Sequence, residues 1–393
     1  MTINFKEQAQ EIHDELIEIR RWFHMHPELS FEEVETGKKI AEILRKHGIE
    51  VKEQVGKTGL VGILKGGKSG KVVGLRADID ALPITEINEV SYKSTVEGKM
   101  HACGHDSHMT SLIGAAMLLS KVKDQIPGTV KFIFEPAEEI NQGAKAMIAD
   151  GALKDPDVDA IYGLHNSPNI DAEKVGVKEG PLMAAVDTIK IKIHGESGHG
   201  AVPHKARDAI VAASAVVMNL QTIVSRKISA FETAVVSIGT FHGGKANNVI
   251  SESVEMTGTC RTYNPEVRKQ LPDLMRNIVE KICEAHHTTG ELEYEFTLPA
   301  VMNEEKTAAI GKKAVAKIVG EEGVVMPELT GGGEDFALYQ QEVPGTFYFL
   351  GVRNEEKGIV NEWHSQNFNI DERALWVGAG IYAQSAFDYL NEG

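Results

Sequence analysis

The stretch "VDTIKIKIHG" (186–195) alternates apolar and polar side chains with a period of two. This pattern predicts a strand with one buried and one exposed face, as in an antiparallel sheet. The segments that follow predict a helix, two strands, a second helix and a last strand, within 206–226, 233–244, 251–262, 265–287 and 290–300. The order β-α-β-β-α-β is that of the ferredoxin-like split unit. We therefore expect a small α+β domain over residues 184–298.

On both sides of that domain, strand-like apolar runs alternate with helical patterns. Three such runs end in polar side chains: "KVVGLRADID" (71–80), "GTVKFIFEPAEE" (128–139) and "VDAIYGLHN" (158–166). This alternation predicts a mostly parallel α/β sheet that helices cover on both faces. We expect one discontinuous domain, formed by residues 1–183 and 299–393. Functional side chains should gather where its strands end.

Composition limits the class of protein. A chain of 393 residues is longer than one hydrophobic core usually supports, which agrees with two domains. The net charge of −16 disfavours nucleic acid and anionic membranes as partners. Three cysteines form no disulfide framework, and no signal peptide or apolar run of about 18 residues is visible. We therefore expect a cytoplasmic protein.

The stretch "GKMHACGHDSHM" (98–109) brings three histidines and a cysteine close together. Imidazole and thiolate are ligands of borderline-soft metals such as zinc. Further candidate ligands follow predicted strands or lie in loops: Glu138, Glu139, His165 and His364. Together with Cys103 and His105, they exceed the four ligands of one tetrahedral ion and would suit two ions that share a ligand. For the stretch alone, a polar loop with solvated histidines and a buried cysteine remains the alternative.

Eight motifs resemble, in sequence and in order, those of the dinuclear metallo-amidohydrolases related to aminoacylase. They are "RADIDALP" (76–83), "GKMHACGHDSHM" (98–109), "FEPAEE" (134–139), "GLHN" (163–166), "GHGAVPH" (198–204), "GGKANNVI" (243–250), "GTCRT" (258–262) and "GGEDFALY" (332–339). The family includes hippurate hydrolases, N-acyl-amino-acid amidohydrolases and carboxypeptidases, N-acetyl-diaminopimelate deacetylases and auxin–amino-acid conjugate hydrolases. The resemblance covers essentially the whole chain and implies a catalytic α/β domain with an inserted ferredoxin-like lid and dimerisation domain.

The resemblance implies a centre of two divalent metal ions per subunit. A mixed set of cysteine, histidine and glutamate ligands admits zinc, cobalt, manganese or nickel. The implied ligands, with Cys103 as the bridging thiolate, are Cys103, His105, Glu139, His165 and His364.

The same resemblance implies roles for residues that bind no metal. Glu138 would act as general base and then as general acid, and Asp80 would orient the site. His199 would reach across a dimer to the partner's active site. Asn248 and Arg261 would hold the carboxylate of the substrate, for which the guanidinium fork of arginine is well suited.

The implied activity is hydrolysis of the amide bond of N-acyl amino acids, or of related short peptides and conjugates, by a metal-bound hydroxide. Within the family, an N-acetyl-diaminopimelate deacetylase and a small carboxypeptidase are the alternatives.

Adjacent side chains of a strand point to opposite faces, so Glu138 and Glu139 are expected to have different roles, one in proton transfer and the other in metal binding. Glu138 beside the ligands disfavours a non-catalytic metal-binding scaffold. The expected partners are a small-molecule substrate and further copies of the chain, in a homodimer or a higher homo-oligomer.

A second motif points to a different class of protein. The stretch "GILKGGKS", from Gly62 to Ser69, matches the phosphate-binding loop pattern G-x-x-x-x-G-K-[ST]. In that loop a helix must begin directly after the lysine, because its amino end faces the phosphate. Here the strand-like run "KVVGL" follows, so we expect a hairpin turn. Nucleotide binding is therefore the least favoured alternative.

Overall fold

The computed structural model describes residues 3–392 and divides into two compact units. The larger unit comprises the described residues of Met1–Leu182, Met302–Glu328 and Asp335–Gly393. The smaller unit comprises Met183–Val301 and Leu329–Glu334. The short segment Leu329–Glu334 thus clusters with the smaller unit, although it lies within residues 299–393, which the sequence assigned to the larger domain.

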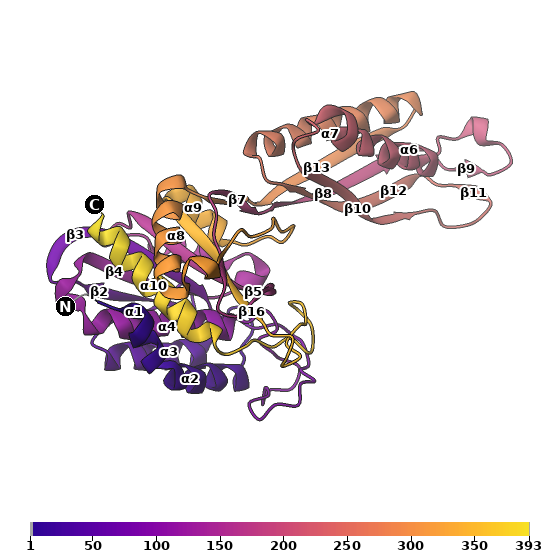
Figure 1. Cartoon of the computed structure of the whole chain (residues 1–393). Helices are drawn as coiled ribbons and strands as arrows, with labels where there is room; N and C mark the ends of the chain where they lie inside the picture. Colours follow the sequence, from indigo (N-terminus) through magenta and orange to yellow (C-terminus); the bar gives the residue numbers. More distant parts are fainter. Residues whose placement is uncertain (1–2, 393) are drawn as a thin grey trace. The chain divides into compact units, whose positions relative to one another are not determined.

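A mixed sheet of eight strands forms the centre of the larger unit, in the order β1-β2-β4-β3-β5-β16-β6-β15 (Figure 1). Strands β4, β3, β5 and β16 run parallel to one another, whereas β1 and β2 are antiparallel to their neighbours. The mostly parallel α/β sheet that the sequence predicted is confirmed. The strands are β1 (Glu50–Val55), β2 (Gly59–Lys65), β3 (Lys68–Asp78), β4 (Pro127–Glu135), β5 (Ala160–Asp171), β6 (Val175–Gly176), β15 (Val324–Val325) and β16 (Gly345–Arg353).

Eight α-helices belong to the described part of the larger unit. They are α1 (Phe5–Glu11), α2 (His13–Met25), α3 (Val34–Lys46), α4 (His105–Lys121), α5 (Gly143–Ala149), α8 (Glu305–Val319), α9 (Phe336–Glu342) and α10 (Ala374–Asn391). Short 3-10 turns are η1 (Lys123–Gln125), η2 (Glu138–Ile140) and η5 (Glu321–Gly323). The helical segment before Pro27 consists of two helices, because the helix is interrupted at Ile12 between α1 and α2.

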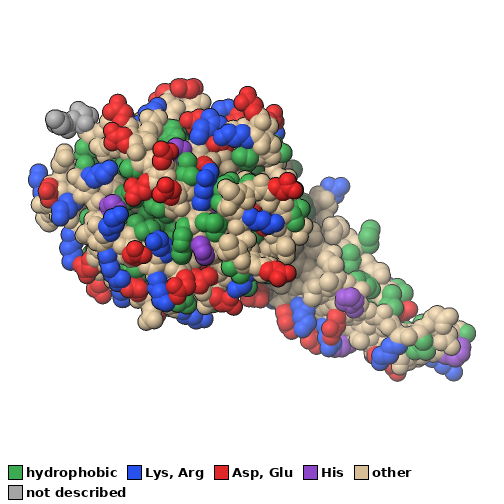
Figure 2. All heavy atoms as spheres, turned by 90° about the horizontal axis from the view of Figure 1, so that it is seen from below, with side chains coloured by type: hydrophobic (Ala, Val, Ile, Leu, Met, Phe, Trp, Pro, Cys, Tyr) green, Lys and Arg blue, Asp and Glu red, His purple; other side chains and the backbone are tan. Residues whose placement is uncertain are grey.

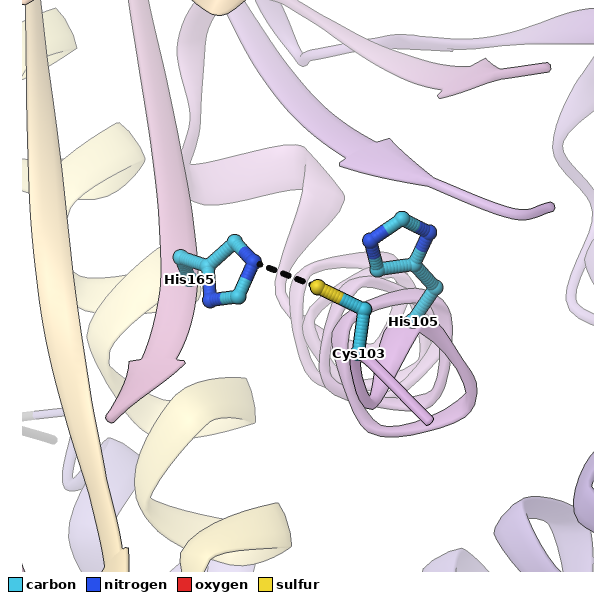
Figure 3. A group of neighbouring side chains, drawn as sticks. All are labelled: Cys103, His105 and His165. Carbon is cyan, nitrogen blue, oxygen red and sulfur yellow. Dashed lines mark hydrogen bonds between the residues drawn. The ribbon is translucent and has the colours of Figure 1, made fainter. Parts of the chain in front are cut away.

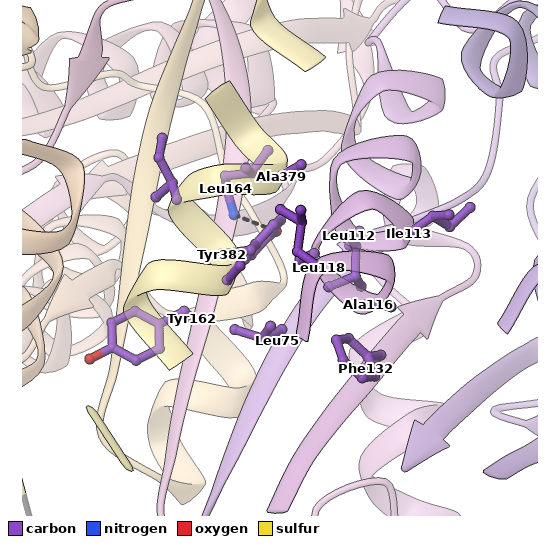
Figure 4. Close-up of a cluster of buried hydrophobic side chains, with 14 of the residues drawn as sticks. Leu75, Leu112, Ile113, Ala116, Leu118, Phe132, Tyr162, Leu164, Ala379 and Tyr382 are labelled. Carbon is purple, nitrogen blue, oxygen red and sulfur yellow. Dashed lines mark hydrogen bonds between the residues drawn. The ribbon is translucent and has the colours of Figure 1, made fainter. Parts of the chain in front are cut away.

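The core of the larger unit lies between the sheet and the helices α4 and α10 (Figure 4). Helix α4 is buried along nearly its whole length; its second half, from Leu112 to Leu119, is apolar on all sides, whereas its first turns carry buried polar side chains. The hydroxyl of Tyr382 in α10 accepts a hydrogen bond from the backbone N–H of Leu164 at 3.0 Å and donates one to the carbonyl of Arg76. Tyr382 therefore ties α10 to β3 and β5 near the ends where the candidate site residues lie.

The smaller unit has the predicted β-α-β-β-α-β order. Its antiparallel sheet has the strand order β10-β12-β8-β13, and α6 and α7 cover the same face of it (Figure 1). Ile189, Ile191 and Ile193 of the alternating stretch are fully buried between sheet and helices, as their spacing predicted. The elements are β8 (Ala185–His194), α6 (Ala209–Thr222), β10 (Ala234–Gly243), β12 (Ser253–Thr262), α7 (Pro265–Ala285) and β13 (Thr289–Leu298).

Smaller elements complete the chain. Two of them are two-stranded sheets: β9 (Gly198–His199) pairs with β11 (Val249–Ile250), and β7 (Gly180–Met183) pairs with β14 (Val301–Asn303). The others are the 3-10 turn η3 (Pro203–Lys205) and the π-helical turn η4 (Ile223–Lys227), which extends α6.

Within residues 3–392, one helix, Ala209–Lys227, is long and apolar enough to cross a membrane. This is weak evidence for a span, because core helices pass the same test, and its buried face packs in the core of the smaller unit.

Charged side chains of both signs are intermixed on the face of the larger unit that Figure 2 shows. On that face the acidic side chains are interspersed with basic ones and form no single patch.

The phosphate-binding-loop match does not form the expected hairpin. Strands β2 and β3 are separated in the sheet by β4, which pairs with both of them. Lys68 and Ser69 are the first residues of β3 itself, where a nucleotide-binding loop would need the start of a helix. The match therefore lacks the structural context of nucleotide binding.

Candidate metal centre

The loop before α4 directs Cys103 and His105 toward one space. Gly104 has a φ of +85° and lets the chain turn sharply from Cys103 into the helix that His105 begins. A side chain at Gly104 would place its Cβ 2.3 Å from Nδ2 of Asn166, so only glycine fits there. His105 is fully buried and Cys103 nearly so.

Cys103, His105 and His165 form the first group of candidate ligands (Figure 3). The Sγ of Cys103 lies 3.3 Å from Nε2 of His165, and the ring of His105 faces the same space from the start of α4. Cys103 also belongs to a second group, with Glu139 and His364, and the ligand atoms of each group lie within 4.8 Å of one another. One thiol, that of Cys103, is therefore common to both groups.

The two neighbouring glutamates do not lie on a strand. Strand β4 ends at Glu135, and Glu138 and Glu139 belong to the 3-10 turn η2, which lies between the left-handed residues Ala137 and Asn141. The expectation that strand alternation sends their side chains to opposite faces is therefore wrong.

Instead, both glutamate side chains approach the same histidine. Oε2 of Glu138 lies 4.0 Å and Oε1 of Glu139 lies 3.8 Å from Nε2 of His105. The other oxygen of Glu139 lies 3.6 Å from Nε2 of His364. Glu139 thus spans two candidate ligands, whereas Glu138 adjoins one of them.

His165 and His364 reach the centre from two further segments. His165 lies within β5 rather than at its end, because β5 continues to Asp171 while it pairs with β16. His364 lies in the loop before α10, with a left-handed φ of +61°, and its backbone N–H donates to the carbonyl of Ala102 at 2.9 Å. Its side chain is 55% exposed, in contrast to the other histidines of the centre.

A buried carboxylate, that of Asp80, contacts His105. Oδ1 of Asp80 lies 3.2 Å from Nδ1 of His105, while Oδ2 accepts hydrogen bonds from the backbone N–H of Glu139 and the hydroxyl of Ser30. When the protonated Nδ1 donates a hydrogen bond to Asp80, the lone pair of Nε2 points to the centre and is free to bind metal.

The electrostatics of the centre favour a cation between these groups. Burial raises the pKa of Glu139 to about 7, although the nearby His105 opposes this shift. Burial disfavours the imidazolium of His105, but the carboxylates of Asp78 and Asp80 raise its pKa to about 10. Burial holds the pKa of His165 well below its usual range. In this environment His165 is a neutral imidazole, the form that binds metal.

Two buried ligand atoms support this conclusion. Within residues 3–392, Nε2 of His105 and Oε1 of Glu139 are buried and have no hydrogen-bond partner. Buried polar atoms are normally paired, and a divalent ion would pair both of them. The thiolate, imidazole and carboxylate donors are a mixed set that zinc and its neighbours accept. The residues present therefore fit a metal centre.

The remaining candidates belong to the smaller unit. His199 in β9 lies opposite Val249 of β11, and the carbonyl of Asn248 accepts a hydrogen bond from Gly200 at 2.8 Å. Arg261 in β12 donates from Nε to the carbonyl of Gly331 at 3.0 Å. The roles of His199, Asn248 and Arg261 in binding substrate stay predictions.

Sequence reasoning missed a charged network beside the ligand loop. Oδ2 of the buried Asp106 lies 2.7 Å from Nε of Arg20 and 2.7 Å from Nδ1 of His24, and Nε2 of His24 lies 3.2 Å from Glu86. All four side chains are buried. The signal available in the sequence was the spacing of four between Arg20 and His24, which puts both on one face of α2.

Comparison with known proteins identifies the family of the chain. The model of peptidase family M20/M25/M40 matches residues 74–388. The chain belongs to this family. It is 44% identical over 376 residues to an N-acetylcysteine deacetylase of Bacillus subtilis, covering 95% of this chain and 96% of that relative. It is 41% identical over 391 residues to thermostable carboxypeptidase 2 of Saccharolobus solfataricus, covering 98% of each.

The solved structures agree with this membership. A Bacillus subtilis protein described as a dinuclear metal-binding peptidase from the M20 family superposes with a TM-score of 0.87 at 40% identity, over 97% of this chain and 99% of that one. The resemblance read from the motifs is thereby confirmed, and so is the enzyme class: the chain is a metal-dependent hydrolase of this family.

Proposed function

We propose that the chain hydrolyses the amide bond of N-acyl amino acids, and that Cys103, His105, Glu139, His165 and His364 hold two divalent ions for this reaction. The observation that carries the proposal is the thiol that two ligand groups share, with the carboxylate of Glu138 beside them. When bound, such ions polarise the amide carbonyl and lower the pKa of water to near 7. Zinc, cobalt, manganese and nickel all suit the ligand set.

Glu138 moves the protons in this proposal. Its side chain is 10% exposed, and Oε2 lies next to His105 without being needed as a ligand. A carboxylate at this place takes a proton from the attacking water at Oε2 and returns it to the nitrogen of the leaving amine. Asp80 keeps His105 in the required orientation throughout.

The smaller unit supplies recognition and assembly. Arg261 and Asn248 bind the carboxylate of the amino-acid half, since a guanidinium pairs with a carboxylate through two hydrogen bonds. His199 serves the active site of a partner subunit in a homodimer. Exposed apolar side chains on the outer face of α6, Val211 at 51% and Met218 at 70%, support such an interface on this unit. A cytoplasmic location fits this assignment.

A panel of substrates tests the proposal. The protein is loaded with each of the four metals and assayed with N-acetyl, N-benzoyl and indole-acetyl amino acids and with dipeptides. Dipeptides test the carboxypeptidase alternative, because the same centre would cleave a C-terminal peptide bond, and a relative at 41% identity bears that name. We expect turnover of at least one N-acyl amino acid. A folded protein with two ions bound and no turnover of the panel would refute the proposal.

A further inference from the structure

Asn166 follows His165 in β5 and touches three of the segments that carry proposed ligands. It is fully buried. Its Nδ2 donates to the carbonyl of Cys103 at 2.6 Å, and its Oδ1 accepts from the indole N–H of Trp363 at 2.9 Å. Its own backbone carbonyl accepts from Nδ1 of His165 at 2.8 Å, which leaves Nε2 of that ring directed at Cys103.

The orientation of the Asn166 amide is fixed from behind by His108. Nδ1 of His108 lies 2.6 Å from Oδ1 of Asp78, so it carries the proton and its Nε2 is an acceptor. That Nε2 accepts from both the backbone N–H of Asn166 at 2.9 Å and its Nδ2 at 2.7 Å. A flipped amide would set Oδ1 against two acceptors, the carbonyl of Cys103 and this nitrogen. The Asn166 oxygen must therefore face Trp363.

Trp363 extends this contact to His364, the third histidine among the proposed ligands. It directly precedes His364, and its ring packs edge-on against the ring of His165, with centroids 5.1 Å apart. His364 itself is half exposed and has a left-handed backbone, which a non-glycine residue adopts only when its surroundings hold it there. The indole N–H bond to Asn166 is a side-chain anchor of that loop.

We propose that Asn166 and Trp363 are positioning residues, which hold Cys103, His165 and His364 in place for the metal ions. Asn166 joins the Cys103 loop, the ring of His165 and the His364 loop through one amide group and one carbonyl. Trp363 carries this constraint to His364. The inference rests on the proposed function, because it takes the ligand assignment from there.

Two variants test the inference through metal affinity rather than turnover. Trp363→Phe keeps a ring against His165 and removes only the indole N–H. Asn166→Ala removes the amide that binds Cys103 and Trp363. Residues that orient metal ligands typically change metal affinity by ~10–100-fold when mutated, and we expect losses in this range for both variants.

Matched controls separate positioning from general stability. Asn303 is also a buried amide, whose bonds go to Lys178 and to both backbone groups of Phe347. Trp22 packs on Phe23 and His26. We expect Asn303→Ala and Trp22→Phe to leave the metal affinity of the folded protein unchanged.

Affinity is measured on metal-free protein by titrating zinc or manganese against a chromophoric chelator, with thermal unfolding recorded for each metal-free variant. Wild-type protein that binds no metal would refute the proposed function. Wild-type protein with two ions, together with Trp363→Phe and Asn166→Ala of unchanged affinity, would overturn the inference alone. Equal losses in the Asn303→Ala control would overturn it as well. If Asn166→Ala does not fold, Trp363→Phe decides the result.

Discussion

Glutamine at Glu138 should stop proton transfer while leaving the metal in place. The substitution keeps the size of a nearly buried side chain and removes the basic oxygen 4.0 Å from Nε2 of His105. Loss of a general base lowers turnover by ~10²–10⁴, equivalent to about 3 to 5 kcal/mol of barrier. Added metal should restore none of this activity, since no ligand is missing.

Glutamine at Glu139 should act on metal binding first. The Glu139 oxygens lie 3.8 Å from Nε2 of His105 and 3.6 Å from Nε2 of His364, so this carboxylate serves both ligand groups. Two unit charges ~4 Å apart attract by ~4 kcal/mol at an effective dielectric constant of ~20, and a divalent ion doubles that. Metal affinity should therefore fall by more than ~10²-fold. Excess metal should recover part of the activity.

Metal content by elemental analysis and initial rates over a range of added metal distinguish the two variants. If Glu138→Gln loses its metal while Glu139→Gln retains it, the assignment of the two glutamates is reversed and the reasoning fails.

Three further predictions concern stability, recognition and assembly. Burial raises the pKa of Glu33 to about 7, so the folded chain binds this proton more tightly than the unfolded chain and loses stability as the pH rises from about 4.5 to about 7. In urea unfolding, the stability of Glu33→Gln relative to the wild type should therefore rise by up to about 3 kcal/mol as the pH increases from 4 to 8. A stability difference that does not change with pH would contradict this. Arg261→Lys should raise KM for substrates with a free carboxylate and hardly affect their amides, because lysine lacks the two-pronged guanidinium; equal effects in rate assays would remove Arg261 from that site. Mixing His199→Ala with Glu138→Gln chains should partly restore turnover in heterodimers, and no recovery despite subunit exchange shown by native mass spectrometry would place His199 outside the partner's site.

Local patterns predicted the fold well where neighbouring residues decide the structure. The period-two run with Ile189, Ile191 and Ile193 became β8 because one face of that sheet packs on helices. Long-range pairing decided the rest. Strands β2 and β3 follow each other in the sequence, yet β4 lies between them. No property of the two strands alone indicates that insertion.

The turn that carries Glu138 and Glu139 depends on contacts that the sequence does not display. It begins at Ala137, whose left-handed backbone costs energy for a residue with a side chain. The backbone N–H of Ala137 donates to Glu33 at 2.9 Å, which helps to hold that conformation. Glu33 is far away in the sequence, so the sequence does not show that the strand ends at Glu135 and that strand alternation does not apply to Glu138 and Glu139.

For the metal centre, residue chemistry identified candidate ligands but not their supports. Cysteine, histidine and glutamate can be recognised in a sequence as potential metal ligands. An asparagine and a tryptophan do not, and Asn166 and Trp363 meet although 197 positions separate them. The position of His165 within a longer strand was missed for the same reason, since its extension depends on pairing with β16.

Metal removal and return test the central claim most directly. The protein is stripped with a chelator, and hydrolysis of an N-acetyl amino acid is followed while a divalent metal is added and its stoichiometry is recorded. The account predicts no turnover in the stripped protein and recovery that is complete as the content reaches about two ions per chain, because the attacking water needs a metal to ionise at neutral pH. Undiminished turnover in protein shown to be free of metal would contradict it.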